Sequence, residues 1–316
     1  MIFNSVEFFV FLAVTYLLYR ILSFRGQNLM LLVASYIFYG WWDERFLFLI
    51  VLSTAVDFCC GLMIDRGGLT LSERLVPSIY SILAAFLFVT VNWNAVKIGA
   101  KPLGILMKWE QLFPASLSGW LVLIGTLVLV AIANLLYPRL ASIEDKQRRK
   151  IFLVISICTN LGILGVFKYF NFFIDSAEIV IHSLEVQAEF FRLNMILPVG
   201  ISFYTFQTMS YTIDIYRGKL EATNRFLDFA LFVSFFPQLV AGPIERASEL
   251  IPRLLNPRTL NFEQSTRGLC LILFGLFKKV AIADSVASSV NAIYETNGVV
   301  SWYSHAQYST TFDIGG

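Results

Sequence analysis

Long apolar stretches separated by short polar breaks constrain this chain more than any other feature of its sequence. A helix needs roughly 17 to 25 residues to cross the hydrocarbon core of a bilayer. Apolar runs that suit this length, together with less regular ones in the later third, lie at 3–19, 28–42, 45–64, 76–91, 119–137, 151–167, 195–213, 226–241 and 268–291. The pattern predicts an all-α, polytopic transmembrane helical bundle of about nine membrane segments.

The composition supports a membrane protein and excludes two other classes. Hydrophobic residues make up 57% of the chain and charged residues only 15%, with a mean hydropathy of +0.69, whereas a soluble domain is roughly 25% charged. Because this small number of polar side chains cannot cover a water-facing surface, a soluble or disordered protein is excluded. The net charge of +2 is spread along the chain without a basic stripe, and no nucleic-acid partner is expected.

Two further absences shape the expected chemistry. The four cysteines show neither disulfide nor metal-ligand spacing, so we interpret them as small buried apolar residues and expect no metal. The sequence also has no glycine-rich phosphate loop and no G-x-S-x-G elbow. Composition and common soluble-enzyme motifs alone therefore indicate only a polytopic membrane protein.

The basic residues in the loops predict the orientation of the first six segments. If the segments alternate, one side has only Arg45, Lys97, Lys101 and Lys108. The richer side collects Arg20, Arg25, Arg66, Arg74, Arg139, Lys146, Arg148, Arg149 and Lys150. The positive-inside rule makes the richer side cytoplasmic, which places the N-terminus outside. No cleavage pattern follows the first segment, so it is expected to remain as an uncleaved span.

Two polar features lie within or beside the apolar runs. Asp57 falls in the middle of the 45–64 run, where it is either a proton site or a hydrogen-bonded structural residue. In the segment 168–194, apolar and polar residues form two interleaved stripes at helical spacing, which predicts an amphipathic helix at the membrane surface. His182 lies on the polar stripe, and we interpret it as solvated rather than catalytic.

Helix breakers gather in the later third of the chain. Pro198 and Gly200 interrupt one apolar run, and Pro237, Gly242 and Pro243 interrupt or follow the next. Proline removes a backbone donor and disturbs the preceding turn, so these runs should be kinked, broken or re-entrant. Irregular backbone at membrane depth is tolerated where protein or a water-filled cavity covers it. The pattern fits a substrate passage, and ordinary helix kinks are the alternative.

Two stretches identify the chain more closely. The first is ILPVGISFYTFQTMSYTIDIYRG at 196–218 and the second is FFPQLVAGPIER at 235–246. In this order they closely resemble the membrane-bound O-acyltransferase family, within it the bacterial alginate O-acetyltransferase branch. The stretches FNS at 3–5, SYIFYGW at 35–41 and FKYFN at 167–171 are similar to the same branch. The resemblance covers essentially the whole chain.

The resemblance implies acyl transfer within or across the membrane. Proteins of this family are multi-helix bundles with a central tunnel, in which a histidine can act as general base on the acceptor hydroxyl. It implies acetyl-CoA as the donor, with no bound cofactor, and a bacterial inner-membrane location among membrane lipid. It also implies an exported polysaccharide as the acceptor, as in alginate biosynthesis, and a periplasmic partner of the SGNH-hydrolase kind.

The resemblance also locates a departure from the family. In the branch, a stretch of the form Tyr-x-Asp-Phe-Ser-Gly-Tyr precedes the Trp-His stretch that bears the catalytic histidine. Here 312–316 begins to look like the first stretch, with Asp313 in the aspartate's position, and the chain ends. His305 lies before Asp313 rather than after it and is not expected to be catalytic. We therefore expect no catalytic histidine in this chain, which would be a C-terminally incomplete form.

The residues best suited to line a tunnel follow Gly200. Tyr204, Gln207 and Tyr211 step by three and four residues and so share one helical face, with Ser202 nearby. They either face a passage or join helices through hydrogen bonds. We expect one membrane domain, with transmembrane helices over 1–167, the amphipathic helix over 168–194 and an incomplete acyltransferase core over 195–316.

Two other functions remain open on this sequence. One is a non-catalytic membrane scaffold or transport bundle, which broken helices and polar groups at membrane depth suit equally well. The other is a relative that transfers D-alanine rather than acetyl groups. It stays open because neither of the two quoted stretches indicates which acyl group is transferred.

Overall fold

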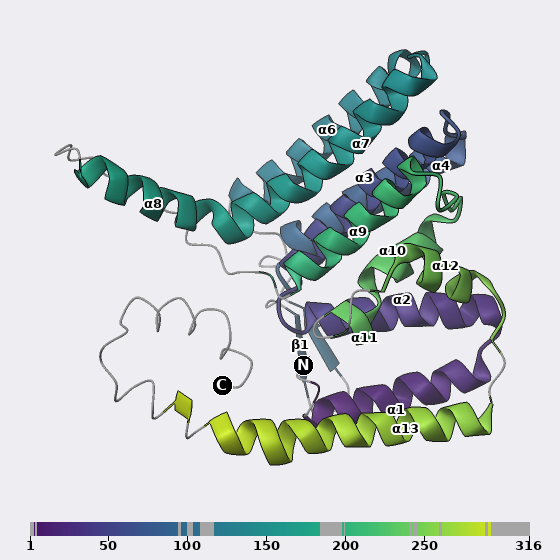
Figure 1. The fold of residues 1–316 in the computed structure, drawn as a ribbon, viewed down its shortest axis with the longest axis vertical. Helices are drawn as coiled ribbons and strands as arrows, with labels where there is room; N and C mark the ends of the chain where they lie inside the picture. Colours follow the sequence, from purple (N-terminus) through teal and green to yellow (C-terminus); the bar gives the residue numbers. More distant parts are fainter. Residues whose placement is uncertain are drawn as a thin grey trace. The chain divides into compact units, whose positions relative to one another are not determined.

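The computed structural model describes residues 3, 5–93, 96–99, 104–107, 117–183, 198, 200–239, 242, 245–258, 261–287 and 290–291. The chain divides into two compact units, Met1–Pro257 and Arg258–Gly316. Figure 1 shows that both are built mainly from helices. The predicted all-α membrane fold is confirmed. Among the described residues, four helical stretches are long and apolar enough to cross a membrane: Arg45–Asp65, Leu71–Thr90, Leu117–Ala141 and Asp145–Ile181. The total of about nine segments stays a prediction.

The first unit contains most of the elements. Its helices are α1 (Val6–Ile21), α2 (Phe24–Gly40), α3 (Arg45–Asp65), α4 (Leu71–Ala84), α6 (Leu117–Ala141), α7 (Asp145–Leu164), α8 (Phe170–Ser183), α9 (Ile201–Tyr216), α10 (Phe226–Ser234), α11 (Phe236–Leu239) and α12 (Ala247–Leu255). Short π-helical segments, η1 (Ala85–Thr90) and η3 (Gly165–Tyr169), extend α4 and α7. The second unit holds α13 (Phe262–Phe277) and η4 (Lys278–Ala283).

A two-stranded hairpin is the one departure from the predicted helical pattern in the described chain. Strands β1 (Val96–Gly99) and β2 (Gly104–Met107) pair antiparallel, with Val96 opposite Met107. The hairpin falls between the predicted spans 76–91 and 119–137, where the sequence analysis expected only a loop. The predicted amphipathic helix is described only as far as Ser183, so its later part lies outside the described residues.

Arginines hold the ends of several helices together at one end of the first unit. Arg66, after α3, pairs with Glu73 of α4 at 3.0 Å, and the same carboxylate accepts from the Thr70 amide to complete a capping box. The buried Arg148 of α7 donates to the carbonyl of Met63 at 3.2 Å, near the C-terminus of α3, where the helix dipole favours a cation. We call this the basic end, the end at which α3 and α6 finish and α4 and α7 begin.

The centre of the first unit is α3. In Figure 1 it runs beside α9, and it also contacts α7 and α4. Of its most apolar window 78% is buried, compared with 11% for α6. Helix α3 is therefore enclosed by protein, whereas α6 presents most of its surface outward.

Asp57 joins three helices at this centre. Its carboxylate accepts hydrogen bonds from Ser156 Oγ at 2.6 Å and Asn160 Nδ2 at 2.7 Å, both on α7. Thr212 of α9 lies 2.9 Å from the Ser156 hydroxyl, and Thr208 donates to Asn160 Oδ1 at 2.9 Å. Because the carboxylate and its partners form one connected buried network, the structure favours the structural interpretation of Asp57 over a proton site.

The expectation that all four cysteines are buried is wrong for two of them. Cys60 is buried and Cys59 partly so, but Cys158 and Cys270 are exposed. Both exposed cysteines lie on apolar helices, α7 and α13, whose outward sides are themselves apolar. In a membrane protein an apolar run does not fix burial, because lipid accepts the same side chains as a protein core does.

Replacing Asp57 tests whether its network holds the bundle together. We expect Asp57→Leu to destabilise the protein by about 1–3 kcal/mol, because it leaves buried donors on α7 without an acceptor. Asp57→Asn, which keeps one acceptor oxygen, should cost less. Thermal unfolding in detergent measures both. Thr126→Val is the control, since the Thr126 hydroxyl bonds only within α6, to Val122; equal losses in Asp57→Leu and Thr126→Val would contradict the prediction.

Candidate functional site

Helices α10, α11 and α12 form a broken helical hairpin, residues 226–255. The start of α10 and the end of α12 lie next to each other. Asn28 Nδ2, near the start of α2, donates to Asp228 Oδ1 at 2.9 Å and to the Leu254 carbonyl at 2.9 Å. The beginning of α10 and the end of α12 are thus both fixed to one buried amide. Figure 1 shows α10 and α12 beside each other near α2. The prediction of broken or re-entrant helices fits this arrangement.

The tip of the broken hairpin lies farther along α2 and at the start of α9. The amide of Phe236 in α11 donates to Ser35 Oγ at 3.2 Å, two turns beyond Asn28. Gly200 caps α9 with φ +74°, and a Cβ placed there would lie 2.4 Å from the Leu239 carbonyl oxygen. Glycine is needed at this position for two reasons, its left-handed backbone and the close approach of α11.

Three of the predicted tunnel residues share the face of α9 that meets the broken hairpin. Gln207 Nε2 donates to the Phe232 carbonyl at 2.7 Å. The ring of Tyr211 lies 4.4 Å from that of Phe229, and its hydroxyl accepts from the Thr223 amide at 3.2 Å. Gln207 and Tyr211 therefore bind α9 to neighbouring segments, which is the packing alternative that the sequence left open.

The other predicted residues do not join this face. Ser202 is only partly buried, and its hydroxyl accepts from Lys168 Nζ at 3.2 Å, on the side of η3. Asp313 and His305 lie outside the described residues, as does the side chain of His182. The structure thus brings together Tyr204, Gln207 and Tyr211 and separates Ser202 from them.

Two buried polar side chains near the tip have no hydrogen-bond partner within the described part of the chain. They are the hydroxyl of Tyr204 and the amide of Gln238, whose oxygen and nitrogen are both unpaired. Tyr204 is one turn from Gly200, and Gln238 lies in α11. Because buried polar groups normally find partners, these two are the groups at the tip best suited to a ligand or to water.

The sequence analysis did not single out Gln238, although it lies inside the quoted FFPQL stretch. The available signal was the proline before it, Pro237, which marks a break in the backbone at membrane depth. A polar side chain directly after such a break often faces the irregular segment rather than lipid.

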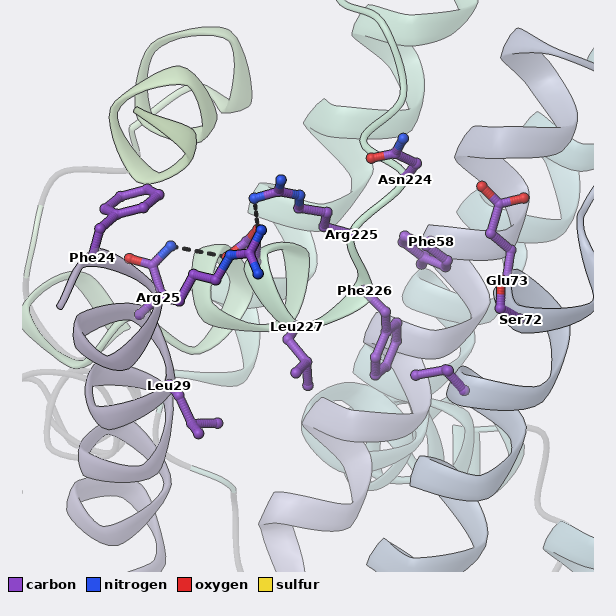
Figure 2. Close-up of a pocket in the computed structure, with 13 residues that line it drawn as sticks. Phe24, Arg25, Leu29, Phe58, Ser72, Glu73, Asn224, Arg225, Phe226 and Leu227 are labelled. Atoms are coloured by element: carbon purple, nitrogen blue, oxygen red, sulfur yellow. Dashed lines mark hydrogen bonds and ion pairs between the residues drawn. The ribbon is translucent and has the colours of Figure 1, made fainter. Parts of the chain in front are cut away.

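A cavity of about 390 Å³ lies where the broken hairpin meets the basic end. Figure 2 shows Phe24, Arg25 and Leu29 of α2 on one side and Ser72 and Glu73 on the other, with residues 224–227 between them. Asp228, also in the lining, is 3.7 Å from Arg225 in an ion pair. The cavity therefore presents the guanidinium of Arg25 beside that of Arg225, which is itself paired with Asp228, and beside Glu73, which is paired with Arg66.

Comparison with known proteins finds that the chain is similar to proteins named as acetylases and acetyltransferases. It is 32% identical over 289 residues to a probable alginate O-acetylase AlgI of Pseudomonas aeruginosa, covering 91% of this chain and 41% of that protein. The same identity over 288 residues relates it to the probable alginate O-acetylase AlgI of Pseudomonas putida, with 91% and 44% covered. The chain is a relative of the alginate-type O-acetyltransferases. The resemblance inferred from the motifs is thereby confirmed.

The relatives also extend beyond alginate. A peptidoglycan O-acetyltransferase of Helicobacter pylori is 31% identical over 205 residues, which cover 55% of this chain and 38% of that protein. The chain spans about two fifths of the length of the curated relatives it matches. No family model and no solved structure matches it.

Gly200 and Gly218 allow a matched test of the contact at the tip. Both have positive φ, +74° and +70°, but a Cβ at Gly218 would meet nothing within 4 Å. Alanine at either position costs about 1–2 kcal/mol for the left-handed backbone. Gly200→Ala should cost about 1–3 kcal/mol more, because the added carbon collides with the α11 backbone. Thermal unfolding of the two variants measures the difference, and equal losses would show that α11 does not press against Gly200.

Proposed function

We propose that the protein is a membrane-bound O-acetyltransferase that directs acetyl groups to hydroxyls of an exported polysaccharide. The observation that carries the proposal is the 32% identity to probable alginate O-acetylases along 91% of the chain. The helices that are long and apolar enough to cross a membrane support a membrane location for this chemistry. Because the relatives named above act on alginate and on peptidoglycan, the acceptor class is a polysaccharide.

The donor in this proposal is acetyl-CoA, a thioester that carries phosphates. The cavity at the base of the broken hairpin suits its approach, because Arg25 and Arg225 offer cations that attract phosphate. The basic end then faces the cytoplasm and the N-terminus lies outside, in the inner membrane of a bacterium. A periplasmic partner of the SGNH-hydrolase kind receives the acetyl group on the other side.

The acceptor end of the reaction lies at the tip of the broken hairpin. Acyl transfer needs a general base to take the hydroxyl proton and donors that stabilise the oxyanion formed on the thioester carbonyl. The Tyr204 hydroxyl and the Gln238 amide supply unpaired donors within the core over 195–316. The proposal assigns the role of base to neither His182 nor His305.

Deleting the gene tests the proposed function. Acetate released by mild base from surface polysaccharide should fall to background in the deletion strain and return when the gene is restored, with alginate and peptidoglycan fractions assayed separately. Loss of ester-linked D-alanine instead of acetate would favour the D-alanyl alternative. Unchanged esters of both kinds would contradict the proposal and favour a scaffold or transport role.

Substitutions in the restored gene then test the residues. Tyr204→Phe should lower ester-linked acetate about 10-fold or more, as loss of a positioned donor does. The unfolding temperature should change little, because the hydroxyl has no described partner. His305→Ala should leave acetylation unchanged. Normal acetylation by the Tyr204→Phe variant would show that Tyr204 is not part of the site. Loss of acetylation in His305→Ala would contradict the exclusion of His305 as the base.

A further inference from the structure

A second and larger cavity lies on another side of α3, apart from the broken hairpin. Its volume is about 610 Å³, within the range of roughly 300–1,000 Å³ that suits small molecules. Its walls come from α3, α4, α6 and α7, which belong to the four helical stretches long enough to cross a membrane. Most of the lining is apolar and includes Leu52, Val56, Val128, Ile132, Phe152 and Ile155.

The cavity exists because α6 does not close against its neighbours. Val128 and Ile132 line it yet keep 51% and 50% of their surface exposed. A Cβ at Gly125, which also lines the cavity, would meet no atom within 4 Å. Apolar walls with an outward-facing helix at membrane depth are in contact with lipid. The space therefore suits an acyl chain better than water.

One part of the lining is polar and lies at the basic end. Arg74 NH2 donates to Asn134 Oδ1 at 3.0 Å, and the guanidinium carbon lies 4.2 Å from the Tyr137 ring centroid. The neighbouring carboxylate, Glu73, is already paired with Arg66 at 3.0 Å. Within the described residues the recorded partners of Arg74 are thus neutral, and its charge is left for an anion.

We infer that this cavity binds an anionic phospholipid of the bilayer, with one acyl chain between α6 and α7 and its phosphate at Arg74. An acyl chain matches the apolar walls, and a phosphate oxygen matches a guanidinium held in place by Asn134 and Tyr137. The position of Arg74 at the basic end suits a headgroup, because that end also carries Arg66, Arg139 and Arg148. This inference does not depend on the proposed acetyl transfer.

The test compares lipids on the purified full chain in detergent by native mass spectrometry. Palmitoyl-oleoyl phosphatidylglycerol (POPG) is the anionic probe, and the corresponding phosphatidylcholine (POPC) has the same chains without net charge. We expect POPG to bind more tightly than POPC. Arg74→Gln should weaken POPG binding about five-fold and leave POPC unchanged. Lys146→Gln is the matched control, since Lys146 is an exposed cation in the first turn of α7, also at the basic end, and lines neither cavity; it should leave the binding of both lipids unchanged.

A second pair of variants tests the acyl-chain part of the cavity. Gly125→Leu fills the space and should weaken binding of both lipids. Gly162→Leu is the control and should not weaken lipid binding. Gly162 also lies in an apolar helix where an added Cβ would meet no atom within 4 Å, but it does not line the cavity. If Gly125→Leu fails to fold, the effect of Arg74→Gln on POPG binding still tests the inference. Equal binding of POPG and POPC, or equal effects of Arg74→Gln and Lys146→Gln, would overturn the inference. Palmitate that displaces POPG at equal concentration would identify a free fatty acid instead.

Discussion

The buried carboxylate of Asp57 is the interaction on which the arrangement of the first unit depends. A charged or polar group at membrane depth is costly unless its hydrogen bonds are satisfied within the protein. Here the partners come from α7, and two threonines of α9 complete the network. Because apolar packing alone discriminates poorly between helix registers in lipid, this polar contact fixes how α3, α7 and α9 face one another. The orientation of α9 in turn directs Tyr204, Gln207 and Tyr211 toward the broken hairpin.

The broken hairpin shows how a discontinuous segment is tolerated beside such a bundle. Its ends and its break leave backbone groups without helical partners, and these must be satisfied by other parts of the protein. Asn28 and Ser35, both on α2, supply two of these contacts. Helix α2 thus supports a segment that could not stand alone in lipid. Within the described part of the chain, Gln238 of α11 and Tyr204 of α9 remain as buried polar groups without a hydrogen-bond partner.

The sequence predicted the first six helices well because their length and hydrophobicity are local properties. The runs 45–64 and 119–137, for example, correspond to Arg45–Asp65 and Leu117–Ala141. The later third was harder, since the hairpin is defined by contacts such as Asn28 with Asp228, which are 200 residues apart. Helical spacing correctly grouped Tyr204, Gln207 and Tyr211. The same geometry explains why Ser202 lies on a different face: two residues from Tyr204, it is about 200° around the helix, and its hydroxyl accepts from Lys168.

Helix α3 also separates the two cavities. Phe58 lines the one beside the broken hairpin, whereas its neighbours Cys59 and Cys60 line the one between α6 and α7. Helix α4 repeats this division, with Glu73 on the first cavity and Arg74 on the second. Glu73 is fixed by Arg66 and by the cap at Thr70. A ligand bound to Arg74 therefore contacts the start of α4 at a point where the helix is held by these bonds. Helices α3 and α4 are therefore the walls that the two cavities have in common.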